Sequence, residues 1–558
     1  MPIRVSTFSE EEAFQPDISS WLEEGDKLLK EGRFEEAEKC FLKVKEINPQ
    51  SPAVYNGLGF VAYQKKDFKE AVKSFKKALQ FNPAYSQAWN NLGASYLALS
   101  HFSEAKSAFA KAVGLNPNLQ DALENLGWIV DNFFANSFKL PTLSVCLIMK
   151  NEEQNLPRLL SSVAEYGEEV VAVDTGSTDR SVEIARLHGA KVYFYRWNDD
   201  FSAAKNEALR HARGEWILAL DADEEMNAED LKKLKLILAC SNYQAFMLPI
   251  KSPLDPEEKN HMLNYLVRVF KNRPEIRYRG RVHETVESSL LELGEKICKL
   301  HHLFISHHGY KEPGKTGWKV FSRNRDLLLK AAEEEPDNVN TLAYLGRTYL
   351  SQGHWEEAKE YLEKVLALST GFNFSVLSAR LDLAWIALQE DNLEEAFSQL
   401  TLLRQKEPHF PDGYYLLGLT YHKKGEYAEA LAAFEQVFQV DYRKSGSPMF
   451  FFRVSLGDLY QKMGECYLLL GNPEKAKECL QKVEELSGDS ASSLNNLGVA
   501  AMRLGEREKA ENYFRKALTL DPAHPDARSN LFRFLLEAGR TKEAKRCLEE
   551  MKEFLQES

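Results

Sequence analysis

The spacing of hydrophobic positions divides the chain into two outer regions and a different middle. To about residue 135, and again from residue 336, apolar residues follow the spacing of amphipathic helices. Between Pro141 and about Glu312, short apolar runs of strand length alternate with amphipathic stretches. Such alternation is typical of a parallel sheet covered by helices. We therefore predict an α/β domain between two all-α regions.

The middle segment reads as strand and helix in turn. Predicted strands are LSVCLIMK, EEVVAVDTGS, KVYFYRW and EWILAL, and predicted helices are NEEQNLPRLLSSVAEY, TDRSVEIARLHG and FSAAKNEALRHARG. We expect Thr178 or Ser177 to cap the second helix and Gly214 to close the third. Ligands of such sheets bind beyond the carboxyl ends of the strands.

The amino-terminal region repeats with a period of 34 residues. Three sets of residues recur at this step: Pro49, Pro83 and Pro117; Gly25, Gly59, Gly93 and Gly127; Ala37, Ala71 and Ala105. Each Ala follows its Gly by 12 residues, which suits two helices that meet where a large side chain would hold them apart. We expect Phe34, Phe68 and Phe102 to fill the next layer.

The 12-residue offset returns in the carboxy-terminal region. It gives six pairs: Gly346/Ala358, Ala384/Ala396, Gly418/Ala430, Gly464/Ala476, Gly498/Ala510 and Phe532/Ala544. Wider steps between pairs predict insertions at residues 369–375 and 441–452. Both regions resemble tetratricopeptide (TPR) repeats, as in NNLGASYLALSHFSEAKSAFAKAVGLNP. Stacked repeats form a superhelix whose concave face binds a peptide or partner protein. The alternative is that the repeats only dimerise or carry the protein.

These patterns give predicted boundaries. We expect a tail over 1–16, a TPR array over 17–137 that ends in a capping helix docked on the next domain, and an α/β domain over 141–312. A linking helix over 313–335 and a second array over 336–558 complete the chain.

Composition narrows the class of protein. Among 558 residues, 44% are hydrophobic and 28% charged, as in ordinary globular proteins, and the net charge of -12 argues against a nucleic-acid partner. Seven cysteines without a C-x-x-C pair indicate neither a zinc site nor a disulfide framework. The amino terminus lacks a signal-peptide pattern, and no apolar run approaches the roughly 20 residues of a membrane span. We expect a soluble cytoplasmic protein.

The stretch GEWILALDADEEM places acidic residues directly after an apolar strand. Asp221 and Asp223 would lie at the binding edge of the sheet, where two carboxylates in alternate positions can face one hard cation such as Mg²⁺ or Mn²⁺. On this interpretation the negative charge after the strand has no compensating protein side chain because a bound cation is its counterion. The alternative is an acidic turn in which Asp223 caps the next helix.

Four motifs in order, LSVCLIMKNEEQNL, VVAVDTGSTDRSVEIA, WNDDFSAAKNEAL and GEWILALDADEEM, resemble family 2 glycosyltransferases. These enzymes have the GT-A fold, a Rossmann-like nucleotide-diphospho-sugar transferase fold, and the resemblance covers about residues 142–310. It implies that Asp174 contacts the nucleotide base or ribose, that Asp221 and Asp223 carry the metal, and that Lys205 faces the diphosphate. Other donor-binding candidates in the motifs are Asn151, Glu152 and Asp200. The alternatives are a turn role for Asp174 and a solvated helix face for Lys205.

Inverting transfer needs a carboxylate that takes the acceptor's proton. The segments RYRGRVHETVE and LFISHHGY are the candidates downstream of the acidic motif. We predict Glu284 as this base, His283 as a residue that orients substrate, and His307 as the distal metal ligand, with His308 as the next candidate. The alternative for His307 is a structural histidine. The Q-x-x-R-W pattern of processive members is absent, which favours a single-addition enzyme.

A transferase between repeat arrays resembles bacterial TPR-containing glycosyltransferases, including the peptide S-glycosyltransferases of glycocin biosynthesis. We predict a metal-dependent inverting hexosyltransferase that uses a nucleotide sugar, expected to be a UDP-sugar, and a protein or peptide acceptor held by the repeats. An inward row of Asn56, Asn90, Asn91 and Asn125 would bind the peptide backbone, or else join neighbouring helices. Two other functions compete: transfer to a lipid or saccharide core with the repeats for recruitment, and a scaffold with a vestigial transferase centre.

Overall fold

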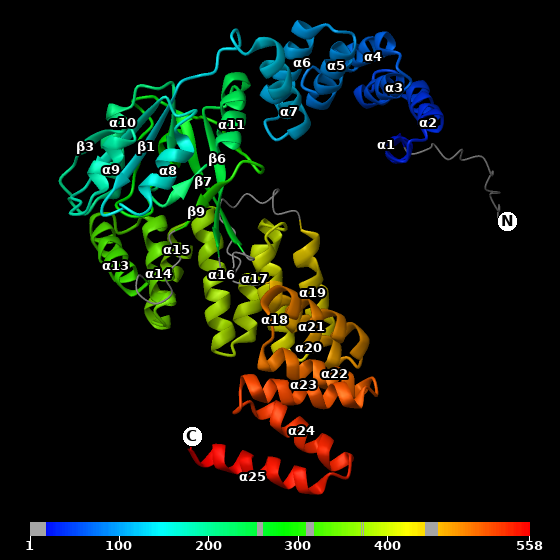
Figure 1. The fold of residues 1–558 in the computed structure, drawn as a ribbon, viewed down its shortest axis with the longest axis vertical. Coiled ribbons are helices and arrows are strands. Elements are labelled where there is room, and N and C mark those ends of the chain that lie inside the picture. The colour runs from blue at the N-terminus through cyan, green and yellow to red at the C-terminus, as the bar shows by residue number, and fades with distance from the viewer. Residues whose placement is uncertain are drawn as a thin grey trace, which may run out of the picture.

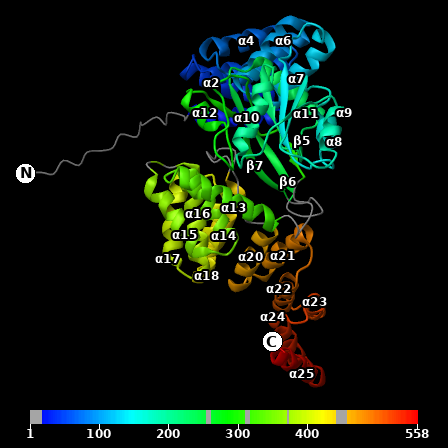
Figure 2. The same cartoon turned by 90° about the vertical axis from the view of Figure 1, so that its left-hand side faces the viewer.

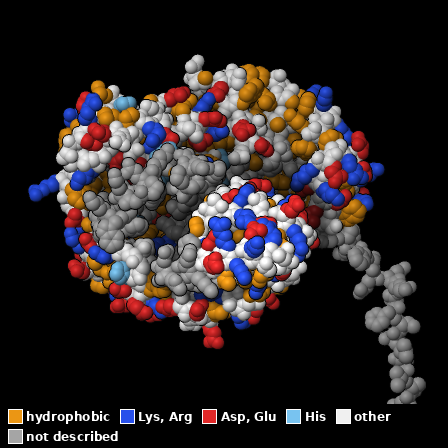
Figure 3. Space-filling model, turned by 60° about the horizontal axis from the view of Figure 1, so that its bottom comes forward, with side chains coloured by type: hydrophobic (Ala, Val, Ile, Leu, Met, Phe, Trp, Pro, Cys, Tyr) orange, Lys and Arg blue, Asp and Glu red, His pale blue; other side chains and the backbone are white. Residues whose placement is uncertain are grey.

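The computed structural model describes residues 18–253, 261–308, 317–369, 371, 373–440 and 456–557. A central α/β domain lies between two arrays of paired helices, and the arrays leave it in different directions (Figures 1 and 2). On the face drawn in Figure 3, positive and negative side chains are interspersed and neither sign gathers into a stripe.

The amino-terminal array consists of three helix pairs and a seventh helix. The bounds are α1 Ile18–Lys30, α2 Phe34–Ile47, α3 Pro52–Gln64, α4 Phe68–Phe81, α5 Ser86–Ala98, α6 Phe102–Leu115 and α7 Gln120–Ile129, and α7 continues as one π-helical turn, Val130–Phe134.

The aromatic side chains of this array include a set that the sequence analysis did not name. A Cβ added to Gly25 would lie 2.8 Å from Phe41, and the equivalent glycines meet Phe75 and Phe109. Phe34, Phe68 and Phe102 stand at the first position of their helices and are only partly buried. The aromatic ring that needs the glycine lies seven residues, about two turns, further along the same helix face.

The carboxy-terminal array follows α13 (Gly317–Glu334), and its described residues form six helix pairs. They are α14 Val339–Ser351, α15 Trp355–Leu368, α16 Phe374–Gln389, α17 Leu393–Lys406, α18 Pro411–Lys424, α19 Tyr427–Gln439, α20 Leu456–Leu469, α21 Pro473–Ser487, α22 Ala491–Arg503, α23 Arg507–Leu520, α24 Pro525–Glu537 and α25 Thr541–Glu557. The predicted insertion at 441–452 lies outside the described residues, and the one at 369–375 is described in part.

The central sheet has the strand order β3-β2-β1-β4-β7-β6-β9-β5, with β8 paired to β6. The strands are β1 Leu143–Met149, β2 Glu169–Asp174, β3 Lys191–Phe194, β4 Trp216–Ala219, β5 Glu224–Glu225, β6 Ala245–Pro253, β7 His261–Lys271, β8 Ile297–Lys299 and β9 Ile305–His307. The first four in sequence run parallel, whereas β7 is antiparallel to β4 and β6. The sheet is therefore mixed, and the prediction of a parallel sheet holds for one half.

The central domain also contains five helices among its described residues, and hydrogen bonds at their first turns show where two of them begin. They are α8 Leu156–Val163, α9 Ser181–Leu187, α10 Phe201–His211, α11 Ala228–Cys240 and α12 Glu287–Glu292. The predicted cap of α9 is wrong, because the helix begins at Ser181 and Asp179 accepts a hydrogen bond from the Ser181 N–H at 3.0 Å. The alternative role of Asp223 as a helix cap is also wrong, since Asn227 caps α11.

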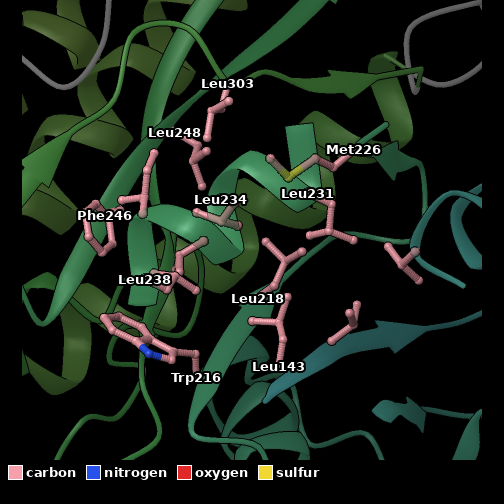
Figure 4. Close-up of a cluster of buried hydrophobic side chains, with 14 of the residues drawn as sticks. Leu143, Trp216, Leu218, Met226, Leu231, Leu234, Leu238, Phe246, Leu248 and Leu303 are labelled. Atoms are coloured by element: carbon pink, nitrogen blue, oxygen red, sulfur yellow. The ribbon is translucent and has the colours of Figure 1, made fainter. Parts of the chain in front are cut away.

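Both arrays pack on the central domain through shared apolar clusters. One cluster joins Phe109 of α6 and Leu126 of α7 to the domain core, part of which is drawn in Figure 4 around Trp216 and Leu234. On the other side, Tyr265 of β7 is buried in a cluster with residues of α16 to α20. The contacts place the first helices of the carboxy-terminal array beside the sheet.

Candidate functional site

A cavity of about 690 Å³ opens beyond the carboxyl ends of β1 and β4. This is the sheet edge at which the sequence predicts ligand binding. Residues of the central domain that line it include Met149, Lys150, Glu152, Thr175, Trp197, Phe201, Lys205, Asp221, Asp223, Arg268, Tyr278, Val282, His283, Glu284, Glu287 and His307. Three further lining residues, Asn340, Tyr344 and Phe374, belong to the carboxy-terminal array. The cavity is thus built by two parts of the chain.

A network of charged side chains, most of them buried, lies at this cavity. The Asp221 carboxylate is 2.9 Å from Lys205 Nζ and 2.7 Å from Arg268 Nη2, one cation at each oxygen. Arg268 also pairs with Glu224 at 2.6 Å, and Lys205 with Glu284 at 2.6 Å. The acidic charge that follows β4 is therefore not left uncompensated for a ligand. Two protein cations, 16 residues before and 47 residues after Asp221, already neutralise it.

Burial and ion pairing act in opposite directions on the carboxylates of this network. Burial raises the pKa of Asp221, but Arg268 and Lys205 outweigh it and hold that pKa well below its usual range. Burial raises the pKa of Glu224 to about 7 although Arg268 opposes the shift. Lys205 is buried rather than on a solvated helix face, and its two carboxylate partners raise its pKa against the effect of burial. Asp221 therefore stays ionised and is committed to Lys205 and Arg268.

Asp223 and His307 lie side by side at the cavity because β5 and β9 pair antiparallel. Glu224 stands opposite His307 in this pairing, which brings Asp223 Oδ2 to 3.2 Å from His307 Nε2. Ser252 Oγ lies 3.2 Å from Nδ1 of the same ring. Burial is the largest single effect and lowers the pKa of His307. The hydrogen bond with Asp223 and the negative charges of Asp223, Glu224 and Asp221 together outweigh it, so the net shift is upward. His308 instead contacts Glu225, at 2.9 Å.

This pair fits a divalent cation that is completed by a substrate. The described part of the chain contains no group of three or more His, Cys, Asp and Glu side chains placed to hold an ion. Mg²⁺ and Mn²⁺, however, usually take one or two protein side chains and fill their shell with water and phosphate oxygens. Asp223 and His307 supply an oxygen and a nitrogen donor, and Ser252 fixes the ring. Asp221 also lines the cavity, but each of its oxygens already contacts a protein cation.

Asp174 lies at the end of β2 but is not among the residues that line the cavity. The residue is 3% exposed, and its side chain accepts hydrogen bonds from the N–H groups of Gly176 and Ser177 at 3.0 and 3.1 Å. These contacts match the alternative role of Asp174, in which it stabilises the turn after β2. Its neighbour Thr175 lines the cavity.

The other donor candidates are divided between the cavity and its supporting loops. Glu152 lines the cavity, and burial raises the pKa of its carboxyl group. Asn151 adopts a left-handed backbone (φ 59°) and accepts a hydrogen bond from Thr178 N at 2.8 Å, so it joins the loops after β1 and β2. Asp200 caps α10 through the Ala203 N–H at 3.0 Å.

The segment between Tyr278 and Glu287 meets the carboxy-terminal array. Arg279 and Thr285 form a β-bridge, and His283 sits at the tip with φ 56°. Its ring stacks on Tyr344 of α14 with centroids 3.8 Å apart and planes 11° from parallel. Desolvation by the surrounding protein and then the charge of Arg347 lower the pKa of His283 to about 4. The ring is therefore neutral near pH 7, although one face remains open to the cavity.

The predicted asparagine row joins neighbouring helices. Asn91 Nδ2 donates to Asn56 Oδ1 at 3.1 Å, and Asn125 Nδ2 donates to Asn90 Oδ1 at 3.0 Å. The same link recurs between Asn530 and Asn495 at 2.9 Å in the other array. These contacts are those of the alternative left open for the row.

The cavity residues that the sequence analysis did not single out include Arg268, Glu287 and Tyr344. Arg268 had a local signal, since NYLVRVF sets one charge in an apolar strand and a buried charge needs a partner. Tyr344 had none, because its position in a repeat says nothing about the domain it faces.

Comparison with known proteins agrees with the geometry. Residues 144–285 match the model of glycosyl transferase family 2, and TPR models match segments on both sides, among them 18–51, 86–119, 325–371 and 501–558. The chain thus contains a family 2 glycosyltransferase domain between tetratricopeptide repeats.

Curated relatives share parts of this architecture. A TPR repeat-containing protein of Synechococcus elongatus is 35% identical over 231 residues, which are 40% of this chain and 56% of that protein. The SPbeta prophage-derived glycosyltransferase SunS of Bacillus subtilis is 26% identical over 276 residues, 49% of this chain and 65% of SunS. An uncharacterized glycosyltransferase of Rickettsia typhi is 30% identical over 155 residues, 27% of this chain and 52% of that protein. The chain thus spans between half and two thirds of these relatives. No helix among the described residues has the length and apolar character to cross a membrane.

Proposed function

We propose that the protein transfers a sugar, with inversion, from a nucleotide diphosphate donor to a protein or peptide acceptor, and that a divalent cation assists. One observation carries this proposal. The cavity of a family 2 glycosyltransferase domain is walled in part by Asn340, Tyr344 and Phe374 of a TPR array. Repeat arrays of this kind bind peptides and proteins, so the acceptor would meet the donor where the two parts join.

The donor end of the cavity has the charges that a diphosphate leaving group needs. Asp223 and His307 would hold Mg²⁺ or Mn²⁺, which stabilises negative charge on the departing diphosphate when it is bound. Lys205 adds a positive charge to the same cavity and is kept in position by Asp221 and Glu284. Glu152 follows β1 and Thr175 follows β2, and both lie where the nucleoside would bind. Asp174 stabilises the turn after β2 through its hydrogen bond with Gly176.

The acceptor end lies at the seam between the segment 278–287 and α14. An inverting reaction requires the nucleophile to approach the anomeric carbon from the side opposite the diphosphate, with a carboxylate near it. Glu284 and Glu287 both line the cavity on the segment that meets Tyr344. A polypeptide held along the array would reach this seam without crossing the donor site.

Nucleotide release from a panel of UDP- and GDP-sugars with Mn²⁺ or Mg²⁺ tests the proposal. Wild type should release nucleotide from one donor class, and Asp223→Ala should lose that activity. Glu229→Ala is the matched control, because this exposed acid in the first turn of α11 pairs only with Lys233 among the described residues. If wild type neither binds nor hydrolyses any donor, the proposal is rejected.

A further inference from the structure

We infer that Glu287 takes the proton from the incoming nucleophile, and that Glu284 instead holds Lys205 in place. The inference rests on the proposed function, and it replaces the base that the sequence suggested. It starts from a difference between two carboxylates that line one cavity three residues apart. One is engaged in a buried ion pair, and the other is not.

Glu284 is committed to the charge network. Its Oε1 lies 2.6 Å from Lys205 Nζ, and the two side chains are only 13% and 10% exposed. A proton added to Glu284 would break this pair and leave the buried ammonium with Asp221 as its remaining partner. Removing one charge from a buried pair is costly, because the remaining charge stays out of water without full compensation. Proton transfer to Glu284 would therefore disturb the residue that faces the leaving group.

Glu287 has the opposite surroundings. It begins α12, and its backbone N–H donates to Thr285 Oγ1 at 3.1 Å, which fixes the start of the helix. Within the described residues, no hydrogen bond or ion pair reaches its carboxylate. Burial raises the pKa of Glu287, which moves this carboxylate towards the pH at which a general base works best.

Glu287 also faces the seam where the acceptor would enter. Burial raises the pKa of Tyr344 to about 12, and the charges of Glu287 and Glu284 add to this shift, so both carboxylates lie near the phenol of α14. His283 stacks on the same tyrosine and immediately precedes Glu284 in the segment. A side chain presented by the repeat array would thus meet Glu287 at the wall of the cavity.

The step balances in atoms and charge. A hydroxyl or thiol of the acceptor gives its proton to a carboxylate oxygen of Glu287, and its electron pair forms the bond to the anomeric carbon. The bond between that carbon and the diphosphate oxygen breaks, and its electron pair leaves with the nucleotide diphosphate. Glu287 then returns the proton to solvent.

The test uses the full chain and the nucleotide sugar that wild type hydrolyses. Donor dissociation constants and rates of nucleotide release are compared for Glu287→Gln, Glu284→Gln and the control Glu292→Gln, an exposed residue of the same helix that pairs with Arg279. The products formed with sodium azide are measured in parallel. Azide is an anion with no proton to lose, so its attack on the sugar needs no base.

We expect Glu287→Gln to bind donor within twofold of wild type and to release nucleotide to water roughly 100-fold more slowly or worse, in the range typical of a lost general base. Its reaction with azide should stay near the wild-type rate. Glu284→Gln should weaken donor binding and slow both reactions alike, and Glu292→Gln should match wild type.

Two results would overturn the inference. One is release by Glu287→Gln within threefold of wild type. The other is an equal loss of the water and azide reactions in that variant, which would indicate a structural role. A wild type that binds no donor would instead reject the proposed function itself.

Discussion

Arg268 offers a direct test of the charge network, because its removal leaves one buried carboxylate without a cation. In Arg268→Met, Asp221 keeps Lys205, whereas Glu224, which is 2% exposed, loses the cation that pairs with it. Breaking a buried ion pair from one side costs about 3–5 kcal/mol of unfolding free energy. Burial already raises the pKa of Glu224 to about 7, so this residue would take up a proton and limit the loss. We therefore expect about 3 kcal/mol.

For a domain of this size the loss corresponds to a fall in Tm of about 6–12 °C. The assay is differential scanning calorimetry of the full chain. The unfolding transition whose midpoint changes among the variants is assigned to the central domain. Arg279→Met is the control, since its pairing with Glu292 is at the surface, where an ion pair contributes little to stability. In Glu224→Gln/Arg268→Met the orphaned charge is also removed, and about half of the lost stability should return. An Arg268→Met protein that melts within 2 °C of wild type, or a double variant no more stable than the single one, would refute the reasoning.

Three further predictions concern the seam and the arrays. Tyr344→Ala should leave donor binding unchanged and raise the acceptor KM roughly 10-fold, as for a lost aromatic contact of about 1.4 kcal/mol, and an unchanged KM would remove Tyr344 from the acceptor site. Gly418→Ala should lower the unfolding free energy measured in urea by about 1–3 kcal/mol, because the new Cβ would collide with Phe434. Gly371→Ala, whose Cβ would enter open space, should lower it little, and equal losses in the two variants would contradict this packing. The folded pKa of His283, about 4, lies below its ordinary 6.5, so the unfolded chain takes up the proton first and stability should fall between pH 6.5 and 4. His283→Asn should flatten this fall, and an identical pH profile would speak against a desolvated, neutral ring.

The sequence predicted the strands and repeat helices whose pattern of apolar and small residues is complete within one segment of the chain. The parallel strands β1, β2 and β4 are buried apolar runs, and such runs can be recognised in the sequence without knowledge of the strands that pair with them. The glycine and alanine positions of the repeats likewise mark close helix contacts. The aromatic partner of each glycine was not predicted, because the 34-residue period fits Phe34 and Phe41 equally and only the helix geometry distinguishes them.

The site was predicted less completely, because its contacts join distant segments. The sequence placed Asp221, Asp223 and Lys205 at one edge of the sheet, and the structure brings them into one cavity. Asp221 has a partner in Arg268, 47 residues later, and no spacing rule connects them. Tyr344 reaches the cavity because the carboxy-terminal array packs on the central domain, where Tyr265 of β7 is buried among its helices. Sequence reasoning therefore found the residues at the strand ends and missed those that tertiary packing delivers.

The most direct test of the account is the fate of a labelled sugar. The full chain would be incubated with the donor that it hydrolyses, Mn²⁺ and three separate acceptor pools: a random peptide library, a lipid extract and a mixture of oligosaccharides. We predict that wild type places the label on peptides and that Asp223→Ala does not. Label found only on lipid or saccharide, or transfer that Asp223→Ala performs at the wild-type rate, would contradict the account.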